Sequence, residues 1–237
     1  MQKMKEKIRT LVLSLGADIC GFAHIDRFDN APKGFNPADI FPDCRSVIAF
    51  GIALPKGLAG INPRLVYGYF NSFTFPETDK IALQTAKRME EDYPCTAVPV
   101  PCDSPYEYWD AENMEGRGLI SMNHTAVAAG LGAIGKSSLL LNPRYGNMLT
   151  LGALLTDLDL PSDPVSENIC KDNCRKCMDN CPVGAIENGR VNQKLCRNNT
   201  YGKTQRGFDT VDCNRCRTVC PMNYGDCKLS DSGIGSL

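Results

Sequence analysis

The sequence predicts an α/β domain over residues 1–160, followed by a small ferredoxin-like domain over residues 161–237. Three observations support this division. Helical and strand patterns alternate over the first 160 residues. A linker that contains Pro and Asp follows at 161–167, and a cysteine motif then occurs twice. At 237 residues, the chain is long enough for one ordinary domain and a small second one.

The first helix is predicted from hydrophobic periodicity. Residues 1–15 form an amphipathic helix rather than an export signal, because Ile8, Leu11, Val12 and Leu15 recur at helical spacing. The remaining elements follow from apolar runs bounded by Pro, Gly and capping residues. Strands are expected at 19–23, 46–54, 95–100 and 149–156, and helices at 78–91 and 119–129.

Two segments of this domain are predicted to be irregular. Residues 55–78 are rich in Gly, Pro, Asn and aromatic residues. Residues 103–117 form a polar loop that holds Tyr106, Tyr108 and the only tryptophan, Trp109. Both segments are expected to line a surface rather than to build the core.

The composition indicates a soluble globular protein of a reducing compartment. Hydrophobic residues make up 43% of the chain, and the net charge of -1 argues against a dedicated polyanion binder. Basic residues nevertheless outnumber acidic ones between positions 171 and 220, where they can offset the negative charge of metal-bound thiolates. No stretch approaches the ~20 apolar residues that span a bilayer. Thirteen cysteines without an export signal predict a cytoplasmic location.

The cysteine motif predicts two 4Fe-4S clusters. The block Cys-x-x-Cys-x-x-x-Cys-Pro occurs at 174–182 and again at 213–221, and one further cysteine precedes each block. Eight thiols are the number that two such clusters need, and the last cysteine of a run commonly ligates the other cluster. The predicted ligands of the first cluster are Cys170, Cys174, Cys177 and Cys220. Those of the second are Cys181, Cys196, Cys213 and Cys216.

Other uses of these cysteines fit the spacing less well. Zinc accepts Cys-x-x-Cys pairs, but its sites do not call for a three-residue gap that closes on Cys-Pro. Disulfides require an oxidising compartment. Cys170 is the least secure ligand, because three residues separate it from Cys174 where two are usual. Cys227 is a ninth thiol in this part of the chain, either a spare surface residue or a replacement for Cys170.

A glycine loop at 130–137 matches two phosphate-binding motifs. Gly130, Gly132 and Gly135 fit Gly-x-Gly-x-x-Gly, and with Lys136 and Ser137 the loop also fits Gly-x-x-x-x-Gly-Lys-Ser. Both motifs need a strand before the loop and a helix after it. Here the preceding residues are helical and the following ones extended, so a nucleotide site is disfavoured. The loop either lies against another cofactor or is a tight turn without a ligand.

The order of these features resembles the epoxyqueuosine reductase family. The resemblance is carried by Ala-Gly-Leu-Gly-x-x-Gly-Lys at 129–136, Leu-Leu-Leu-x-Pro at 139–143, and the double cysteine block that ends in Cys-Pro-Met-Asn at 220–223. It begins early, with Leu-Gly-Ala-Asp-Ile-Cys-Gly-Phe at 15–22. Enzymes of that family reduce the epoxide of a modified wobble base in tRNA, with electrons passed through two 4Fe-4S clusters to cobalamin. Reductive dehalogenases resemble them in cofactors.

The resemblance implies a nitroreductase-like first domain that holds a corrinoid beside the cluster of Cys174. Its implied contacts are the glycine loop (Gly130, Gly132, Gly135 and Lys136), Cys102, Asp103, Tyr106, Trp109 and His124. The acid of the family falls near Gly116 by spacing, where only Asp110, Glu112 and Glu115 are acidic, so no catalytic acid is named. His24 is expected to be structural. Relative to the family, the chain is expected to be a short form without the C-terminal extension.

The sequence and the resemblance are compatible with three functions. The first is a corrinoid-dependent reductase, served by a low-potential ferredoxin or flavodoxin and acting on tRNA or another electrophile. The second is an electron carrier, or an activator that reduces the corrinoid of another protein. The third places FMN in the first domain instead of cobalamin.

Overall fold

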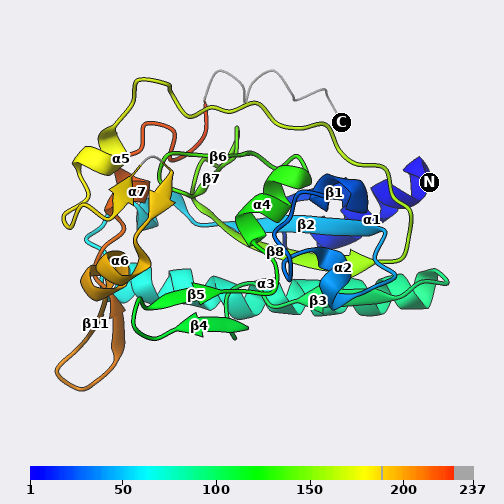
Figure 1. The fold of residues 1–237 in the computed structure, drawn as a ribbon, viewed down its shortest axis with the longest axis horizontal. Coiled ribbons are helices and arrows are strands. Elements are labelled where there is room, and N and C mark those ends of the chain that lie inside the picture. Colours follow the sequence, from blue (N-terminus) through cyan, green and yellow to red (C-terminus); the bar gives the residue numbers. More distant parts are fainter. Residues whose placement is uncertain (188, 227–237) are drawn as a thin grey trace.

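The computed structural model describes residues 1–187 and 189–226, and its centre is a four-stranded antiparallel sheet. The strands are β1 (Ile19–His24), β2 (Ser46–Ala53), β8 (Leu149–Thr156) and β3 (Ala97–Val100), in the order β1-β2-β8-β3. Pro99 lies in β3, an edge strand, where the missing N–H is tolerated. All four strands were expected from the sequence. Figure 1 shows the sheet between helices on its two faces.

Alternation along the strands gives the sheet two buried faces. Val47 and Ala49 of β2 face one core, which also includes residues of α4 (Met122–Ala128). Ile48 and Phe50 face the other core, which is closed by α1 (Gln2–Ser14) and α3 (Leu65–Asp92). Side chains of a strand point alternately to opposite faces, so a strand covered on both sides is apolar throughout, as β8 is.

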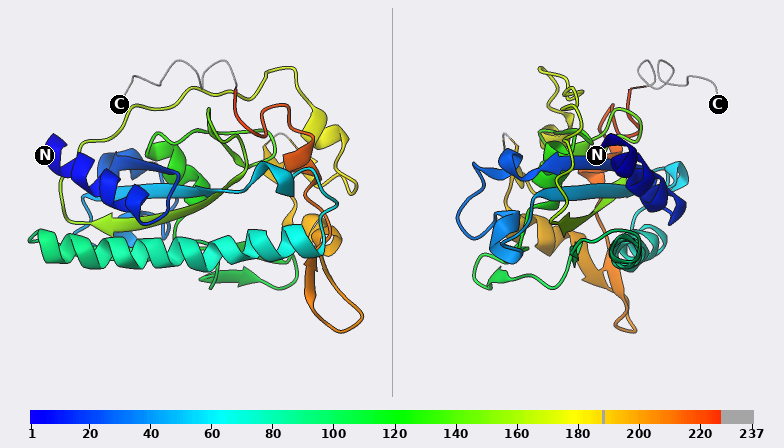
Figure 2. Two further views of the ribbon diagram at one scale, coloured as in Figure 1. Left: turned by 180° about the vertical axis from the view of Figure 1, so that it is seen from behind. Right: turned by 90° about the vertical axis from the view of Figure 1, so that its right-hand side faces the viewer.

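The helix α3 corrects the prediction for residues 55–78. It runs for 28 residues from Leu65 to Asp92, whereas the sequence predicted irregular structure followed by a helix at 78–91. Pro76 lies inside this helix, although proline removes one helical hydrogen bond. The preceding turn is supported by the Thr78 hydroxyl, which donates to the Thr74 carbonyl at 2.7 Å. Figure 2 shows α3 extending along the length of the molecule.

The segment between β3 and β8 is more ordered than the sequence suggested. The polar loop contains a hairpin of β4 (Tyr108–Asp110) and β5 (Glu115–Arg117). Ser121 caps α4, and two short paired strands follow, β6 (Ala133–Ile134) and β7 (Leu140–Leu141). The glycine loop therefore lies between a helix and a strand, the reverse of the order that phosphate loops require.

The cysteine-rich part consists of short elements gathered at one end of the molecule (Figure 1). They are α5 (Lys176–Asp179), β9 (Ile186–Glu187), β10 (Arg190–Val191), α6 (Gln193–Thr200), β11 (Tyr201–Lys203), β12 (Asp209–Val211) and α7 (Arg215–Thr218). Short helical turns elsewhere are α2 (Pro37–Ile40), η1 (Ile25–Phe28) and η2 (Lys56–Leu58). Cys227 lies outside the described residues, so its predicted role is not addressed by the structure.

This part packs directly on the first half of α3. Arg64, which precedes the helix, exchanges backbone hydrogen bonds with Val211. Gly68 faces the same residue, and a Cβ added at Gly68 would lie 3.0 Å from the Val211 nitrogen. A larger residue at position 68 would therefore separate α3 from β12. No helix among the described residues is long and apolar enough to cross a membrane.

Candidate cluster and cofactor site

One set of thiols gathers around α5 and the end of α7. Burial raises the pKa of the Cys220 thiol, and the neighbouring thiols of Cys170, Cys174 and Cys177 raise it further. Burial likewise raises the pKa of Cys177, which also interacts with Cys170 and Cys174. Such effects require short distances, because electrostatic interactions weaken with separation. The thiol of Cys220, in the second block, thus lies within electrostatic range of three thiols in or near the first block.

A second set lies around α6 and α7. Burial raises the pKa of Cys216 to about 11, Arg217 opposes the shift, and Cys196 and Cys213 add to it. Cys181 borders the same cavity as these three residues. The Ala185 amide donates to the Cys181 sulfur at 3.3 Å.

The eight thiols are the number that two 4Fe-4S clusters need. Among the described residues, no three His, Cys, Asp or Glu side chains converge as the ligands of a single metal ion. A 4Fe-4S cluster takes one thiolate on each of its irons, so its ligands surround it instead of meeting at one point. Two sets of thiols, each drawn from both cysteine blocks, have that character.

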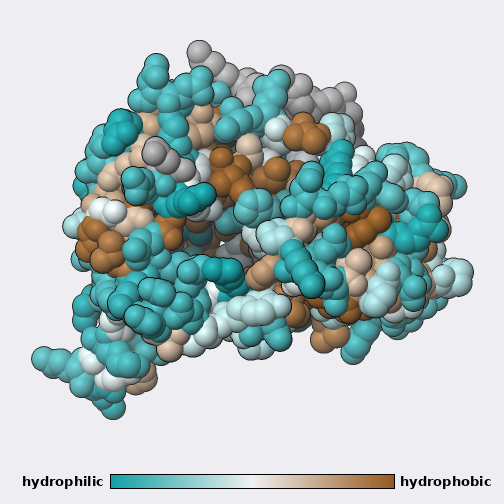
Figure 3. Space-filling model, in the orientation of Figure 1, coloured by the Kyte–Doolittle hydropathy of each residue, from teal (hydrophilic) through white to brown (hydrophobic). Residues whose placement is uncertain are grey.

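A cavity of about 1270 Å³ separates the sheet from the second thiol set. Figure 3 shows this face of the molecule hollowed, with hydrophobic residues at the rim. The walls come from α3, the loop after β3, α4, β8 and the cysteine-rich part. The lining residues include Tyr67, Asn71, Cys102, Asp103, Tyr106 and His124. The volume exceeds the ~300–1000 Å³ of common small-molecule pockets, so a large ligand fits it.

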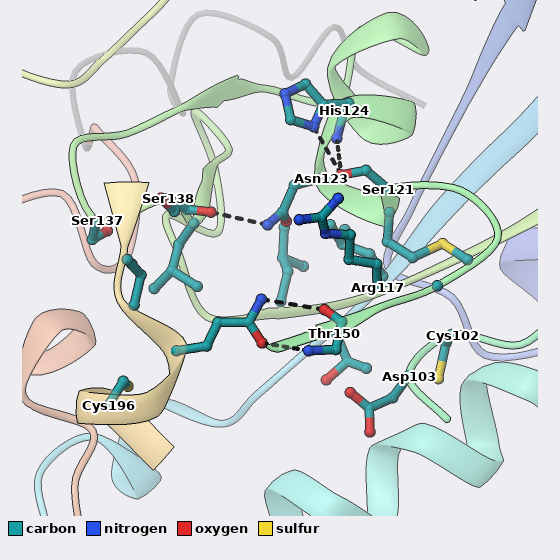
Figure 4. A pocket seen from close by; sticks show the side chains of 18 of the residues that line it. Cys102, Asp103, Arg117, Ser121, Asn123, His124, Ser137, Ser138, Thr150 and Cys196 are labelled. Atoms are coloured by element: carbon teal, nitrogen blue, oxygen red, sulfur yellow. Dashed lines mark hydrogen bonds between the residues drawn. The ribbon is translucent and has the colours of Figure 1, made fainter. Parts of the chain in front are cut away.

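Cys102 and Asp103 lie beside α3, on the side of the cavity opposite His124 (Figure 4). The Cys102 thiol donates to the Phe75 carbonyl at 3.4 Å, and its pKa is raised, mainly by burial, so it stays protonated. Asp103 faces the cavity, and partial desolvation raises the pKa of its carboxyl; Arg197 opposes this shift and Asp79 adds to it. Asp103 is therefore the acid of this cavity whose pKa moves toward neutrality.

Arg197 of α6 connects the cavity wall to the helix that carries Cys196. Its guanidinium donates to the Tyr106 hydroxyl at 3.2 Å and lies 5.3 Å from the ring centre of Trp109. It also donates to the Gln193 side-chain oxygen at 3.1 Å. Gln193 in turn pairs with the backbone of Gly116, accepting from its N–H at 3.0 Å and donating to its carbonyl at 3.2 Å. These contacts fix the loop 103–118 against α6.

His124 borders the cavity on the side opposite Asp103. Its Nδ1 lies 2.8 Å from the Ser121 hydroxyl, the same residue that caps α4 (Figure 4). His24 is not among the cavity-lining residues, and its ring nitrogens lie 3.1 Å from Asp26 and 3.6 Å from Asp159. Its structural role stays a prediction.

Of the glycine loop, Ser137 borders the cavity, whereas Gly130, Gly132, Gly135 and Lys136 are not among the lining residues, and their role as cofactor contacts stays a prediction. A Cβ added at Gly130 would overlap the Pro164 carbonyl, and one at Gly132 would overlap the Leu141 carbonyl. Gly135 packs on the Leu141 side chain. Lys136 turns away and donates to the carbonyls of Lys171, Asp172 and Cys174. The glycines thus serve close backbone packing, and the lysine holds the loop that carries the first thiol set.

The cavity also borders a different thiol set from the one expected. The sequence placed a corrinoid beside the cluster of Cys174, but Cys181, Cys196, Cys213 and Cys216 are the cysteines of the two blocks that line the cavity. Cys196 lies across the cavity from Cys102 and Asp103 in Figure 4. The helix α6 brings Cys196 to this wall, a placement that the linear spacing does not indicate.

Four residues of the site were missed by sequence reasoning: Tyr67, Gln193, Arg197 and Asn214. Tyr67 lies in the part of α3 that was expected to be irregular. Gln193 and Arg197 occupy successive turns of one helix and so share a face, which was a readable signal once Cys196 was proposed as a ligand. Asn214 lies between two predicted ligands, but its side chain could not be assigned without its surroundings.

Known proteins resemble this chain over nearly its whole length. Epoxyqueuosine reductase of Bacillus subtilis is 26% identical over 258 aligned residues, which cover 94% of this chain and 64% of the relative. That of Staphylococcus aureus is 27% identical, with 94% and 66% covered. The resemblance to epoxyqueuosine reductases is confirmed. The chain spans slightly less than two thirds of the length of these relatives, and no family model matches it.

Solved structures share the fold. An epoxyqueuosine reductase with an epoxyqueuosine-modified tRNA stem loop superposes with a TM-score of 0.68 at 19% identity, over 95% of this chain and 66% of that one. A reductive dehalogenase described with a mechanism for B12-dependent dehalogenation gives 0.73 at 20% identity, over 97% of this chain and 34% of that one. The mixed α/β architecture is therefore common to epoxyqueuosine reductase-like and dehalogenase structures.

Proposed function

We propose that the protein is a corrinoid-dependent reductase of the epoxyqueuosine reductase type. The observation that carries the proposal is the cavity of about 1270 Å³, which has Asp103 on one side and the thiols of Cys181, Cys196, Cys213 and Cys216 on another. A redox cofactor in this cavity would lie between a source of electrons and a source of protons. The names of the similar proteins, reductases and B12-dependent dehalogenases, support the same chemistry.

The cluster ligands are proposed as they follow from the sequence. Cys170, Cys174, Cys177 and Cys220 hold the first cluster, and Cys181, Cys196, Cys213 and Cys216 hold the second. The raised pKa of Cys220 next to Cys170, Cys174 and Cys177 supports the first set. A low-potential ferredoxin or flavodoxin would reduce the first cluster, because the second cluster borders the cavity and is better placed to deliver electrons there.

Residues of the cavity would hold and serve the corrinoid. Asn71, Cys102, Tyr106 and His124 are on its walls, and the contacts of Gln193 and Arg197 fix the loop 103–118 that forms one of them. A bound corrinoid would supply the low-potential metal centre that reduces the substrate, while the protein contributes position and charge. Asp103 would donate the proton, since its raised pKa keeps part of the carboxyl protonated closer to neutral pH.

The test of this function is an anaerobic EPR spectrum of the cluster-reconstituted protein with added cob(II)alamin. We expect a base-off cobalt signal together with signals from the reduced clusters. Asn71→Trp places a large side chain on the cavity wall and should abolish the cobalt change while it leaves the clusters intact. Ser72→Trp, next to it on exposed surface, is the matched control.

Other outcomes point to other functions. Clusters with an unchanged cobalt spectrum would contradict the proposal and leave an electron carrier or activator. Intact clusters together with tight FMN binding that is lost in Asn71→Trp would indicate that the cavity binds a flavin instead of a corrinoid. A protein that binds zinc instead of iron in reconstitution would remove the redox function altogether.

We further propose a tRNA stem loop as the substrate, on the support of the similar reductase solved with one. Arg190, Lys194 and Arg206 are exposed on the cysteine-rich part. Their joint replacement by Gln should weaken stem-loop binding and reduce the slope of log K against log salt by roughly 0.7 to 0.9 for each lost phosphate contact. Lys80→Gln and Lys87→Gln on α3 are the controls. Equal affinity in both sets would contradict tRNA binding by this face.

A further inference from the structure

Asn214 carries a buried side-chain amide that the fold leaves without a partner. It lies between Cys213 and Cys216 in the second cysteine block and is 7% exposed. Its backbone carbonyl accepts from the amides of Arg217 at 2.9 Å and Thr218 at 3.2 Å, so the start of α7 fixes its position. Its Nδ2 has no hydrogen-bond partner among the residues that the structure describes. An unpaired buried donor is unfavourable, which indicates a partner that is absent from the chain itself.

Asn214 borders the cavity together with the thiol-bearing residues Cys196, Cys213 and Cys216. The thiols of Cys213 and Cys216 flank it in the chain, and Cys196 interacts with Cys216. Tyr67 of α3, 3% exposed, reaches the same place, since its hydroxyl interacts with both Cys213 and Cys216. A cluster bound here would have two buried donors, an amide and a hydroxyl, next to its sulfur atoms.

The first cysteine block differs at the equivalent position. There the residue directly after the first cysteine is Arg175 instead of Asn214. Arg175 is exposed, and its side chain pairs with Asp179 at 3.3 Å on the outside of α5. The amide donor is thus a feature of the second block, which is the block beside the cavity.

We infer that the Asn214 amide donates a hydrogen bond to a sulfur atom of the second cluster and raises its reduction potential. This rests on the proposed function, because it requires the cluster to be present. Reduction adds negative charge to a cluster, and a donor stabilises the more negative form. The second cluster therefore holds an electron more readily than it would without Asn214, and the electron is retained next to the cavity.

The experiment is an anaerobic redox titration, followed by EPR, of cluster-reconstituted protein without corrinoid. Asn214→Leu keeps the size of the side chain and removes the donor. It should lower the equilibrium constant for reduction of one cluster about tenfold, equivalent to about 59 mV for a one-electron couple, and leave the other cluster unchanged. Asn214→Asp has the same shape, adds charge, and should lower that potential further, which keeps the test decisive if the leucine variant fails to assemble.

Asn180→Leu is the matched control. This exposed asparagine lies beside the first block, and its amide already donates to the Lys176 carbonyl at 3.0 Å. Unchanged potentials in both Asn214 variants, or an equal shift in Asn180→Leu, would overturn the inference while the clusters themselves remain. An unchanged cluster potential with an altered signal of added cob(II)alamin would assign the amide to the cavity ligand instead. Wild-type protein without clusters would overturn the proposed function and the inference together.

Discussion

Replacing Cys220 by Ser removes the cluster that contains Cys174 and leaves the cluster that contains Cys213 intact. The reason is the exchange of the last cysteine between blocks, since the Cys220 thiol interacts with Cys170, Cys174 and Cys177. We expect the iron content of the reconstituted protein to fall by about half, as the loss of one of two equal clusters requires. Iron analysis together with Mössbauer or EPR spectra of the reduced protein measures this.

Double variants identify which cluster is lost. Cys220→Ser combined with Cys174→Ser should lose no more iron than either alone, because both residues serve one cluster. Cys220→Ser combined with Cys196→Ser should lose both clusters. Cys95→Ser, a thiol outside both sets that donates to the Met89 carbonyl, is the control. Greater loss in the first pair than in its single variants would show that the blocks do not exchange ligands.

Replacing Asp103 by Asn stops proton delivery and lowers turnover by about 10² to 10⁴. The carboxyl acts in its protonated form, and its pKa is raised by desolvation. Activity of the native protein should therefore be full at pH values below this pKa and fall as the pH rises through it. In Asp103→Asn this limb of the pH profile should be absent, while iron content and the cobalt spectrum stay unchanged.

Asp110→Asn is the matched control for this prediction. Asp110 lies on the same loop, but hydrogen bonds from Asn113 hold its pKa below the usual value, and its side chain is exposed. Reduction of an epoxyqueuosine-containing stem loop, measured from acidic to alkaline pH, compares the two. Full activity in Asp103→Asn, or an equal loss in Asp110→Asn, would remove Asp103 from the role of proton donor.

The strands of the sheet were predictable from the sequence because their boundaries follow local patterns, whereas their order in the sheet was not predicted. The apolar runs of β2 and β8 are bounded by Pro and polar residues, and the structure places both strands as expected. The first half of α3 was not predictable in this way. Pro76 and the aromatic residues of this segment suggest irregular structure, and its helical form is supported by contact with Val211, far away in the chain.

In the candidate site too, residues marked by local sequence were predictable, and those that depend on tertiary contacts were not. The eight cysteines stand out by spacing alone, since cluster binding constrains the sequence locally. The glycine loop is less informative, because glycine marks any close approach of backbones, and here the approaching groups are Pro164 and Leu141; its role as a cofactor contact stays a prediction. Asp103 was named as a wall residue but not as an acid, since its raised pKa depends on desolvation and on Asp79, against the opposing effect of Arg197.

The length of α3 has a consequence for dividing this protein into parts. Its second half packs in the core with Ile81, Ala86 and Met89, and its first half forms the support for β12 and the cavity wall through Gly68 and Tyr67. A fragment that ends at the predicted boundary of residue 160 would expose the apolar side of that first half to water. Expression of the cysteine-rich segment by itself would likewise remove the surface on which it rests. In a chimera with a homologue, residues 1–160 and the cysteine-rich part should therefore come from the same parent protein.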